Sequence, residues 1–167
     1  MMQDKPLKGK RCLITGANSG IGLATAVGVA QKGAEVVIAC RNLGKAKMAK
    51  EQIIKKSGNN AVSILLADFA DQASIRRMAE QFHQEYGRLD ILVNNAGLIA
   101  TGRQETADGF EYTFAVNHLG YFTVTNLLLP ALEKAPSARI VSVSSEAHRI
   151  GEIHFDDIHL RKGYTNM

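Results

Sequence analysis

Short apolar runs alternate along the chain with longer segments that have helical spacing of apolar residues. The apolar runs, many rich in β-branched residues, predict five strands at residues 11–15, 35–39, 61–67, 89–93 and 138–143. Helical spacing predicts helices at residues 21–32, 43–56, 71–86 and about 108–132. We expect the last helix to bend or break near Asn117, and we expect Pro130 to kink its final turn or end it.

The order of these elements defines a fold class. The strands are continuous apolar runs, which is typical of strands that are covered by helices on both faces. Five strands that alternate with helices predict a doubly wound parallel α/β sheet of the Rossmann type, with strand order 3-2-1-4-5. A chain of 167 residues fits a single domain over residues 1–167, and we predict a loop for residues 150–167.

Composition narrows the possible partners. The net charge of +4 comes from basic residues that are interspersed with acidic ones, so it does not indicate a nucleic-acid surface. No apolar run is long enough to span a bilayer and the first ten residues hold no signal-peptide core, so we expect a cytoplasmic protein. Cys12 and Cys40 are expected to be small buried residues, and the five histidines have no metal-site spacing, so no metal is expected.

A glycine-rich segment follows the first predicted strand and opens the first predicted helix. It reads Thr15-Gly16-Ala17-Asn18-Ser19-Gly20-Ile21-Gly22. Glycines in this context make a tight turn, let the backbone approach a phosphate and pack the helix against the strand, while the helix N-terminus attracts the anion. We therefore predict that a dinucleotide contacts Gly16, Asn18, Ser19, Gly20, Ile21 and Gly22.

A second motif follows the fourth predicted strand and reads Asn94-Asn95-Ala96-Gly97. Ligands of open α/β sheets bind beyond the carboxyl ends of the strands, where this motif falls. We expect Asn94 to hydrogen-bond across to the first turn, and Ala96 and Gly97 to leave room for a ribose. Taken alone, the motif is also compatible with an ordinary Asn- and Gly-rich turn.

Together these motifs resemble the short-chain dehydrogenase/reductase family. The matching marks are residues 15–22, Asp68, residues 94–97, Asn117 and Ser145, which occur in the family's order over essentially the whole chain. Segments that resemble the retinol-dehydrogenase-like branch are Ala39-Cys40-Arg41-Asn42, Val116-Asn117-His118-Leu119-Gly120, Ser144-Ser145-Glu146-Ala147-His148-Arg149 and Phe155-Asp156-Asp157. The resemblance implies an oxidoreductase that transfers hydride between a nicotinamide cofactor and an alcohol or carbonyl substrate of apolar character.

The choice of cofactor is predicted from the end of the second strand. An acid there binds the ribose hydroxyls of NAD, whereas an arginine accommodates the 2′-phosphate of NADP. Arg41 lies at this place with no acid beside it, so we predict NADP. Asp68 resembles the family's adenine-contacting acid, although a turn aspartate is nearly as good an interpretation, and Phe69 is expected to face the adenine through its backbone.

Two catalytic residues are implied by the resemblance. Ser145 matches the family's serine, which hydrogen-bonds the substrate oxygen, and Asn117 matches the helical asparagine, which holds a water in the proton relay. A turn residue is the alternative interpretation of Ser145. An asparagine within a helix is unfavourable by propensity, which favours a specific role for Asn117.

The family's tyrosine–lysine pair has no match. No Tyr-x-x-x-Lys occurs in the 167 residues, and Tyr164 resembles an earlier tyrosine of the retinol-dehydrogenase-like branch. We therefore expect a C-terminally incomplete chain that lacks the family's last strands and is inactive by itself. The alternative is a non-catalytic dinucleotide-binding sensor or interaction module. The homo-oligomer of the full-length family is not carried over to this chain.

Overall fold

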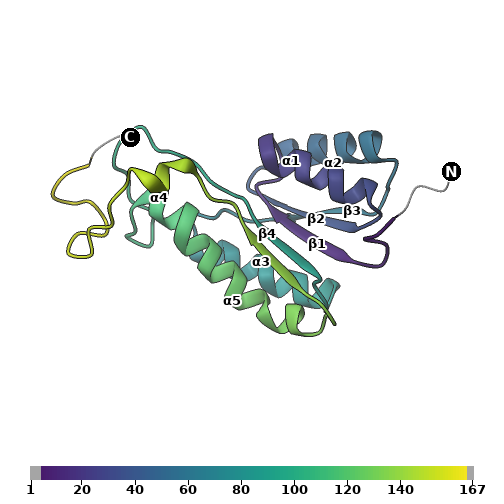
Figure 1. Ribbon diagram of the computed structural model, residues 1–167. Helices are drawn as coiled ribbons and strands as arrows, with labels where there is room; N and C mark the ends of the chain where they lie inside the picture. The colour runs from purple at the N-terminus through teal and green to yellow at the C-terminus, as the bar shows by residue number, and fades with distance from the viewer. Residues whose placement is uncertain (1–4, 165–167) are drawn as a thin grey trace.

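Five parallel strands form one sheet in the computed structural model, which describes residues 5–164 (Figure 1). The sheet order is β3-β2-β1-β4-β5, which confirms the predicted topology. The strands are β1 (Arg11–Thr15), β2 (Glu35–Cys40), β3 (Val62–Leu66), β4 (Ile91–Asn94) and β5 (Arg139–Ser142). Each lies within about two residues of its predicted range.

Helices cover both faces of the sheet. Figure 1 shows α1 (Gly20–Gln31) and α2 (Leu43–Ser57) on one face, and α3 (Gln72–Glu85) and α5 (Gly120–Glu133) on the other. Two of these helices begin at caps that the sequence supplies, because the side chain of Asn42 accepts from the Lys45 N–H and that of Asp71 from the Ser74 N–H.

The two faces of the central strands explain the apolar runs. Cys12 and Ile14 of β1 pack with α1 and α2, whereas Leu13 between them packs with α3 and α5. All three side chains are fully buried. Successive strand residues point to opposite faces, so a strand between two helical layers must be apolar at every position.

The fourth helical segment differs most from its prediction. Residues 105–111 form a turn in which the Thr106 N–H bonds the Phe110 carbonyl, so helix begins only with α4 (Tyr112–Phe114). A π-helix, η1 (Ala115–Leu119), then precedes α5. This π-helix contains Asn117, near which the sequence predicted that the helix bends or breaks. Pro130 lies inside α5 in its last turn, since the helix continues to Glu133.

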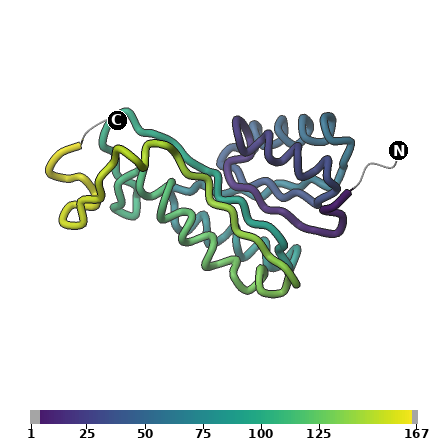
Figure 2. Tube along the Cα trace, in the orientation of Figure 1, coloured from purple at the N-terminus to yellow at the C-terminus, as the bar shows by residue number. Residues whose placement is uncertain are grey.

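The strand β5 forms an edge of the sheet and is the most exposed strand. Figure 2 shows it running beside β4, with which it pairs in parallel register from Ile91↔Arg139 to Asn94↔Ser142. All four residues of β5 are exposed, including Ile140 and Val141. A short 3₁₀ helix, η2 (Glu146–Arg149), follows, and residues 150–164 form neither helix nor strand.

Both cysteines are buried and free, and burial raises the pKa of Cys12 to about 12. Within residues 5–164 no group of three or more His, Cys, Asp or Glu side chains is arranged to hold a metal ion. In that same part of the chain, none of the helices has the length and apolar character needed to cross a membrane.

A buried carboxylate fixes the starts of β1 and β4. Asp90 is fully buried, and its Oδ2 accepts the Arg11 N–H at 2.9 Å. Lys10 and Arg88 each place a side-chain nitrogen 3.2 Å from the carboxylate. Burial by itself would raise the pKa of Asp90, but the Arg11 N–H and the two cations outweigh it and lower the pKa.

We therefore expect Asp90→Asn to lower the free energy of unfolding by about 2 kcal/mol at neutral pH, because the amide removes the charge from these contacts. Because the pKa of Asp90 is lowered in the folded protein, the stabilisation by its charge is fully present above the ordinary carboxyl pKa. This stabilisation is lost as the pH falls through the folded-state pKa. Urea unfolding from pH 7 down to pH 3 measures the difference, which should shrink below about pH 4.

The matched control is Asp156→Asn, since Asp156 is exposed and its ion pair with Lys162 spans 3.8 Å. It should change the free energy of unfolding by less than about 0.5 kcal/mol. An Asp90→Asn difference that stays constant across this pH range would contradict the assignment.

Candidate functional site

A cleft of about 530 Å³ opens at the carboxyl ends of the strands. Most of its lining comes from the segments that follow β1, β2, β3 and β4, which parallel pairing brings to the same edge of the sheet. Its residues are Gly16, Asn18, Ser19, Gly20, Ile21, Ala39, Cys40, Arg41, Ala67, Asp68, Phe69, Asn95, Ala96, Gly97, Leu98, Tyr112, Val116 and Val143. Ten of the predicted contact residues lie here, while Gly22 and Asn94 do not line the cleft.

Two glycines of the first turn occupy places where no side chain fits. Gly16 has a φ of +66°, and a Cβ there would lie 2.8 Å from the Ala96 Cα. A Cβ on Gly22 would lie 2.7 Å from the Gly16 carbonyl oxygen and would collide with the Asn95 amide. Gly22 thus does not line the cleft but lets α1 pack closely against the turn.

The N-terminus of α1 is open towards the cleft. Ser19 is the N-cap residue, but its side chain makes no capping hydrogen bond, and the first turn holds no acidic residue. The first N–H groups of a helix have no partner within the helix and carry its positive dipole end. Ser19, Gly20 and Ile21 therefore present donors and positive potential to the cleft.

A buried cluster of hydrogen bonds joins this turn to the end of β4. The Thr15 hydroxyl is fully buried and accepts the N–H groups of Asn95 and Ala96, both at 2.8 Å. The Asn95 side-chain amide donates to the Thr15 carbonyl at 2.9 Å and more weakly to the Gly16 carbonyl at 3.4 Å. We call these contacts of Thr15 and Asn95 the strand-end clamp.

The clamp corrects the expected contact of Asn94 with the first turn, because Asn95 makes it. Asn94 is the last residue of β4, and neighbouring residues of an extended segment point to opposite faces. Its side chain points to the α5 side, where it donates to the hydroxyls of Thr125 at 3.0 Å and Ser142 at 3.4 Å. Asn94 thereby links β4, β5 and α5 below the cleft.

Arg41 lies at the mouth of the cleft between two polar groups. Its Nη1 donates to the Tyr112 hydroxyl at 3.0 Å and lies 3.9 Å from Asp68 Oδ2. The Arg41 side chain is 64% exposed and that of Asp68 is 38% exposed, so their ion pair is weak. Asp68 also has the turn role that the sequence left open, since its Oδ1 accepts the Ala70 N–H.

Two apolar groups complete the floor near Asp68. Phe69 is buried beneath the π-helix segment, and a Cβ on Gly120 would lie 2.9 Å from its ring. Cys40 is buried beside the first turn, where burial raises its pKa to about 11 while the N–H groups of Ala17 and Asn18 lower it in part. Its thiol thus behaves as an uncharged packing group at neutral pH.

Asn117 has two hydrogen bonds to a single backbone unit. Its Nδ2 donates to the Leu98 carbonyl at 2.8 Å, and its Oδ1 accepts the Leu98 N–H at 2.9 Å. Its Oδ1 also lies 3.4 Å from where a Gly97 Cβ would be. The structure therefore gives Asn117 a definite task, which is to hold the segment after β4 against η1.

Ser145 is exposed at the beginning of η2 and does not line the cleft, although Val143 two residues earlier does. Its Oγ accepts the Ala147 N–H at 3.2 Å and caps this short helix. Ser145 therefore has the turn role that the sequence offered as an alternative, while its hydroxyl proton remains available for a hydrogen bond.

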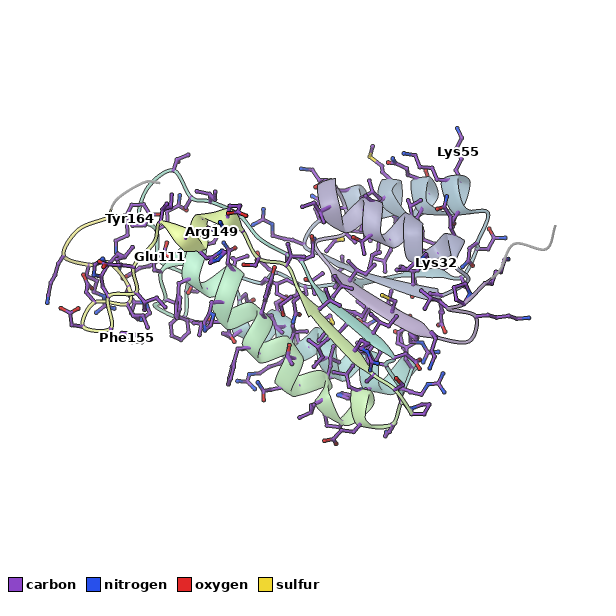
Figure 3. All side chains as sticks on the ribbon, in the orientation of Figure 1. Lys32, Lys55, Glu111, Arg149, Phe155 and Tyr164 are labelled. Carbon is purple, nitrogen blue, oxygen red and sulfur yellow. The ribbon has the colours of Figure 1, made fainter. Side chains whose placement is uncertain are left out.

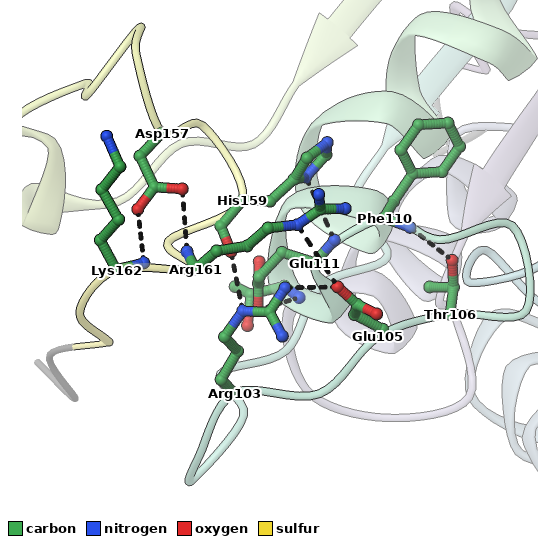
Figure 4. A network of polar contacts seen from close by, with 10 residues as sticks. Arg103, Glu105, Thr106, Phe110, Glu111, Asp157, His159, Arg161 and Lys162 are labelled. Atoms are coloured by element: carbon green, nitrogen blue, oxygen red, sulfur yellow. Dashed lines mark hydrogen bonds and ion pairs between the residues drawn. The ribbon is translucent and has the colours of Figure 1, made fainter.

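A polar network ties the last described loop to the segment before α4 (Figure 4). The Glu111 N–H donates to His159 Nδ1 at 3.3 Å, and the His159 carbonyl accepts from Arg103 Nε at 3.0 Å. Arg103 and Arg161 both pair with Glu105. Figure 3 shows Glu111 at the same end of the molecule as this loop.

Tyr164 belongs to the same docked loop. Its hydroxyl donates to the Ala100 carbonyl at 3.4 Å, and Figure 3 places it far from Lys32 and Lys55 of the α1–α2 layer. The loop from residue 150 to residue 164 therefore folds against the segment that follows β4.

Sequence reasoning assigned no site role to Asn95, Leu98, Tyr112, Val116 and Val143, all of which line the cleft. Asn95 belongs to the second motif, but the sequence does not show to which face of the sheet its side chain points. Tyr112 lies 71 positions from Arg41, and no local pattern joins residues at that distance.

The sheet order and the helices on both faces of the sheet define a Rossmann-type α/β fold, with a glycine-walled cleft at the carboxyl ends of its strands. The short chain dehydrogenase family matches residues 10–156, and the chain belongs to that family. It is 44% identical to mouse (Mus musculus) retinol dehydrogenase 11 and 46% identical to human (Homo sapiens) retinol dehydrogenase 12. Each alignment covers 95% of this chain and 50% of the relative, so the chain spans about half the length of these curated relatives.

Solved structures agree with this assignment. An uncharacterized protein from Mycobacterium paratuberculosis superposes with a TM-score of 0.83 at 38% identity, over 96% of this chain and 55% of its own. A short chain dehydrogenase from Shigella flexneri, complexed with NADP, has a TM-score of 0.77 at 26% identity, over 90% of this chain and 64% of its own. Pseudomonas aeruginosa RhlG, also an NADP complex, has a TM-score of 0.73 at 30% identity, over 87% and 58%.

The strand-end clamp generates a prediction for Thr15. Thr15→Val keeps the shape but leaves the N–H groups of Asn95 and Ala96 without their acceptor, so the free energy of unfolding should fall by about 3 kcal/mol. Thr15→Ser keeps the hydroxyl and should cost about 1 kcal/mol for the lost methyl group. Urea unfolding measures both, and hydrogen exchange at the two amides locates the change. Equal losses in the two variants would contradict the clamp.

Proposed function

We propose that residues 1–167 form a single domain that binds NADP in the cleft and serves an oxidoreductase acting on an apolar alcohol or carbonyl compound. The observation that carries this proposal is the exposed cation Arg41 at the cleft mouth, which has only a weak ion pair with Asp68, while β2 itself ends without an acidic residue. Membership of the short chain dehydrogenase family supports the reaction class.

The first turn fits the diphosphate of a dinucleotide. Gly16 and Gly22 let the first turn and the start of α1 pack closely against the segment after β4, and the uncapped start of α1 directs N–H groups into the cleft. We assign the diphosphate to residues 16–22 and the adjoining ribose to the segment at Ala96 and Gly97. The bound dinucleotide supplies hydride transfer at its nicotinamide ring.

Arg41 supports NADP over NAD. The ribose hydroxyls of NAD are usually held by a carboxylate at the end of the second strand, whereas a guanidinium there forms bidentate hydrogen bonds to a 2′-phosphate. The nearest acid is Asp68, which is 3.9 Å from Arg41 and already accepts the Ala70 N–H. NADP complexes among the similar structures agree with this choice.

Ser145 and Asn117 would serve the substrate side. The Ser145 oxygen accepts the Ala147 N–H, so its proton is free to be donated to a substrate oxygen. Asn117 uses its side chain on Leu98, and we assign it the task of holding the backbone that borders the nicotinamide end. The names of the retinol dehydrogenase relatives support a long apolar alcohol or aldehyde as substrate.

Exchange of Arg41 tests the cofactor choice. Arg41→Ala should weaken NADPH binding about tenfold, the equivalent of about 1.4 kcal/mol, and leave NADH binding unchanged, because only the 2′-phosphate is lost as a partner. Titration followed by the fluorescence of the reduced nicotinamide measures both constants in a chain that contains no tryptophan.

Arg77→Ala is the matched control, since Arg77 is an equally exposed arginine paired with Asp71 at 3.5 Å, away from the cleft. It should leave both binding constants unchanged. Tighter binding of NADH than NADPH by the unaltered chain would overturn the choice of NADP.

The missing tyrosine–lysine pair generates a second prediction. The 167 residues should bind NADPH yet reduce aliphatic aldehydes at least about 10³-fold more slowly than a retinol dehydrogenase, because no Tyr-x-x-x-Lys supplies the proton. An assay of NADPH oxidation at high protein concentration measures the rate, with Ser145→Ala as the background. Turnover close to that of such an enzyme would contradict the inactivity of these residues alone.

A further inference from the structure

We propose that Tyr112 is a positioning residue that acts through Arg41: it holds the Arg41 guanidinium in place across the cleft mouth and, once that guanidinium grips the 2′-phosphate of NADP, donates its own hydroxyl proton to the phosphate. This inference rests on the proposed binding of NADP and adds a residue from a separate part of the chain. Tyr112 lines the cleft, and its hydroxyl oxygen accepts from Arg41 Nη1 at 3.0 Å.

Arg41 needs such a support because little else holds it. Its side chain is 64% exposed, and the nearest oxygen of the Asp68 carboxylate lies 3.9 Å from the guanidinium. A long exposed side chain loses rotamer freedom when it grips a ligand, so fixing it beforehand improves affinity. The bond to Tyr112 uses one N–H of the guanidinium and leaves the others free for an anion.

The Tyr112 hydroxyl can also donate a hydrogen bond of its own. Because a guanidinium can only donate, the Tyr112 oxygen is the acceptor, and its own proton must point elsewhere. Over residues 5–164 no acceptor receives that proton. A phosphate oxygen gripped by Arg41 would lie beside this donor, so the pair offers hydrogen bonds from two different side chains to one anion.

Tyr112 is held firmly at its backbone. The buried carboxylate of Glu111 accepts the N–H groups of Thr113 and Phe114, and the Tyr112 N–H donates to the Gln104 carbonyl at 3.0 Å. Glu111 is held in turn by His159 in the network of Figure 4. A residue fixed in this way can orient a flexible partner, whereas Arg41 could not orient Tyr112.

The decisive experiment compares Tyr112→Phe with the unaltered chain in titrations with NADPH and with NADH. We expect NADPH binding to weaken about fivefold and NADH binding to stay unchanged, since the variant keeps the ring and removes only the hydroxyl. Tyr121→Phe is the control, because Tyr121 is a half-buried tyrosine of α5 outside the cleft, and it should change neither constant. Equal weakening of both cofactors, no change, or tighter NADPH binding would overturn the proposal.

A double-mutant cycle separates this inference from the proposed function. If Tyr112 acts with Arg41, then Tyr112→Phe should have less than about a twofold effect in the Arg41→Ala background. A full fivefold loss in that background would show that Tyr112 does not act through Arg41 and would overturn the positioning role. If Arg41→Ala weakens NADPH and Tyr112→Phe does not, only the positioning role fails. If Arg41→Ala itself has no effect on NADPH, the choice of NADP fails and the role of Tyr112 fails with it.

Discussion

The strand-end clamp is the interaction on which the cleft depends. One buried hydroxyl, that of Thr15, accepts two N–H groups from the segment after β4, and the Asn95 side chain donates a hydrogen bond to the carbonyl at the end of β1. This exchange brings Ala96 so close to Gly16 that only glycine fits there. The requirement for glycine at this position therefore comes from the protein's own packing.

Burial of the strands and the order of the elements explain which parts of the fold could be predicted from the sequence. Strands buried between two helical layers are apolar throughout, and the alternation of strands with helices leaves few topologies, so the sheet order was predicted correctly. The helix expected from about residue 108 was wrong at its start, because Glu111 caps α4 and the Thr106–Phe110 turn precedes it. Side-chain caps of this kind decide a boundary without changing the apolar pattern.

The site was predictable where chemistry is local in sequence and not where it depends on direction or long-range contact. The glycines of the first turn stand at a characteristic spacing between a strand and a helix, so the sequence could locate the turn, although the contacts that require glycine at Gly16 and Gly22 include Ala96 and Asn95. The roles of Asn94 and Asn95 depend on which face of the sheet each side chain meets, and two adjacent asparagines do not reveal this. Tyr112 reaches Arg41 only because the fold brings the first residue of α4 to the cleft, which no spacing in the sequence indicates.

The two ends of the cleft offer different kinds of hydrogen-bond donor, backbone N–H groups at the first turn and side chains at the mouth. At the first turn the donors are backbone N–H groups of a helix N-terminus, fixed by the clamp and by buried glycine contacts. At the mouth the donors are two side chains, that of Arg41, which is exposed, and that of Tyr112, which is partly buried. In the proposed binding mode the first turn would hold any dinucleotide, because every such ligand carries the diphosphate. In that proposed mode, discrimination between ligands would come from the mouth, where the charge of Arg41 and the hydroxyl of Tyr112 meet the ligand.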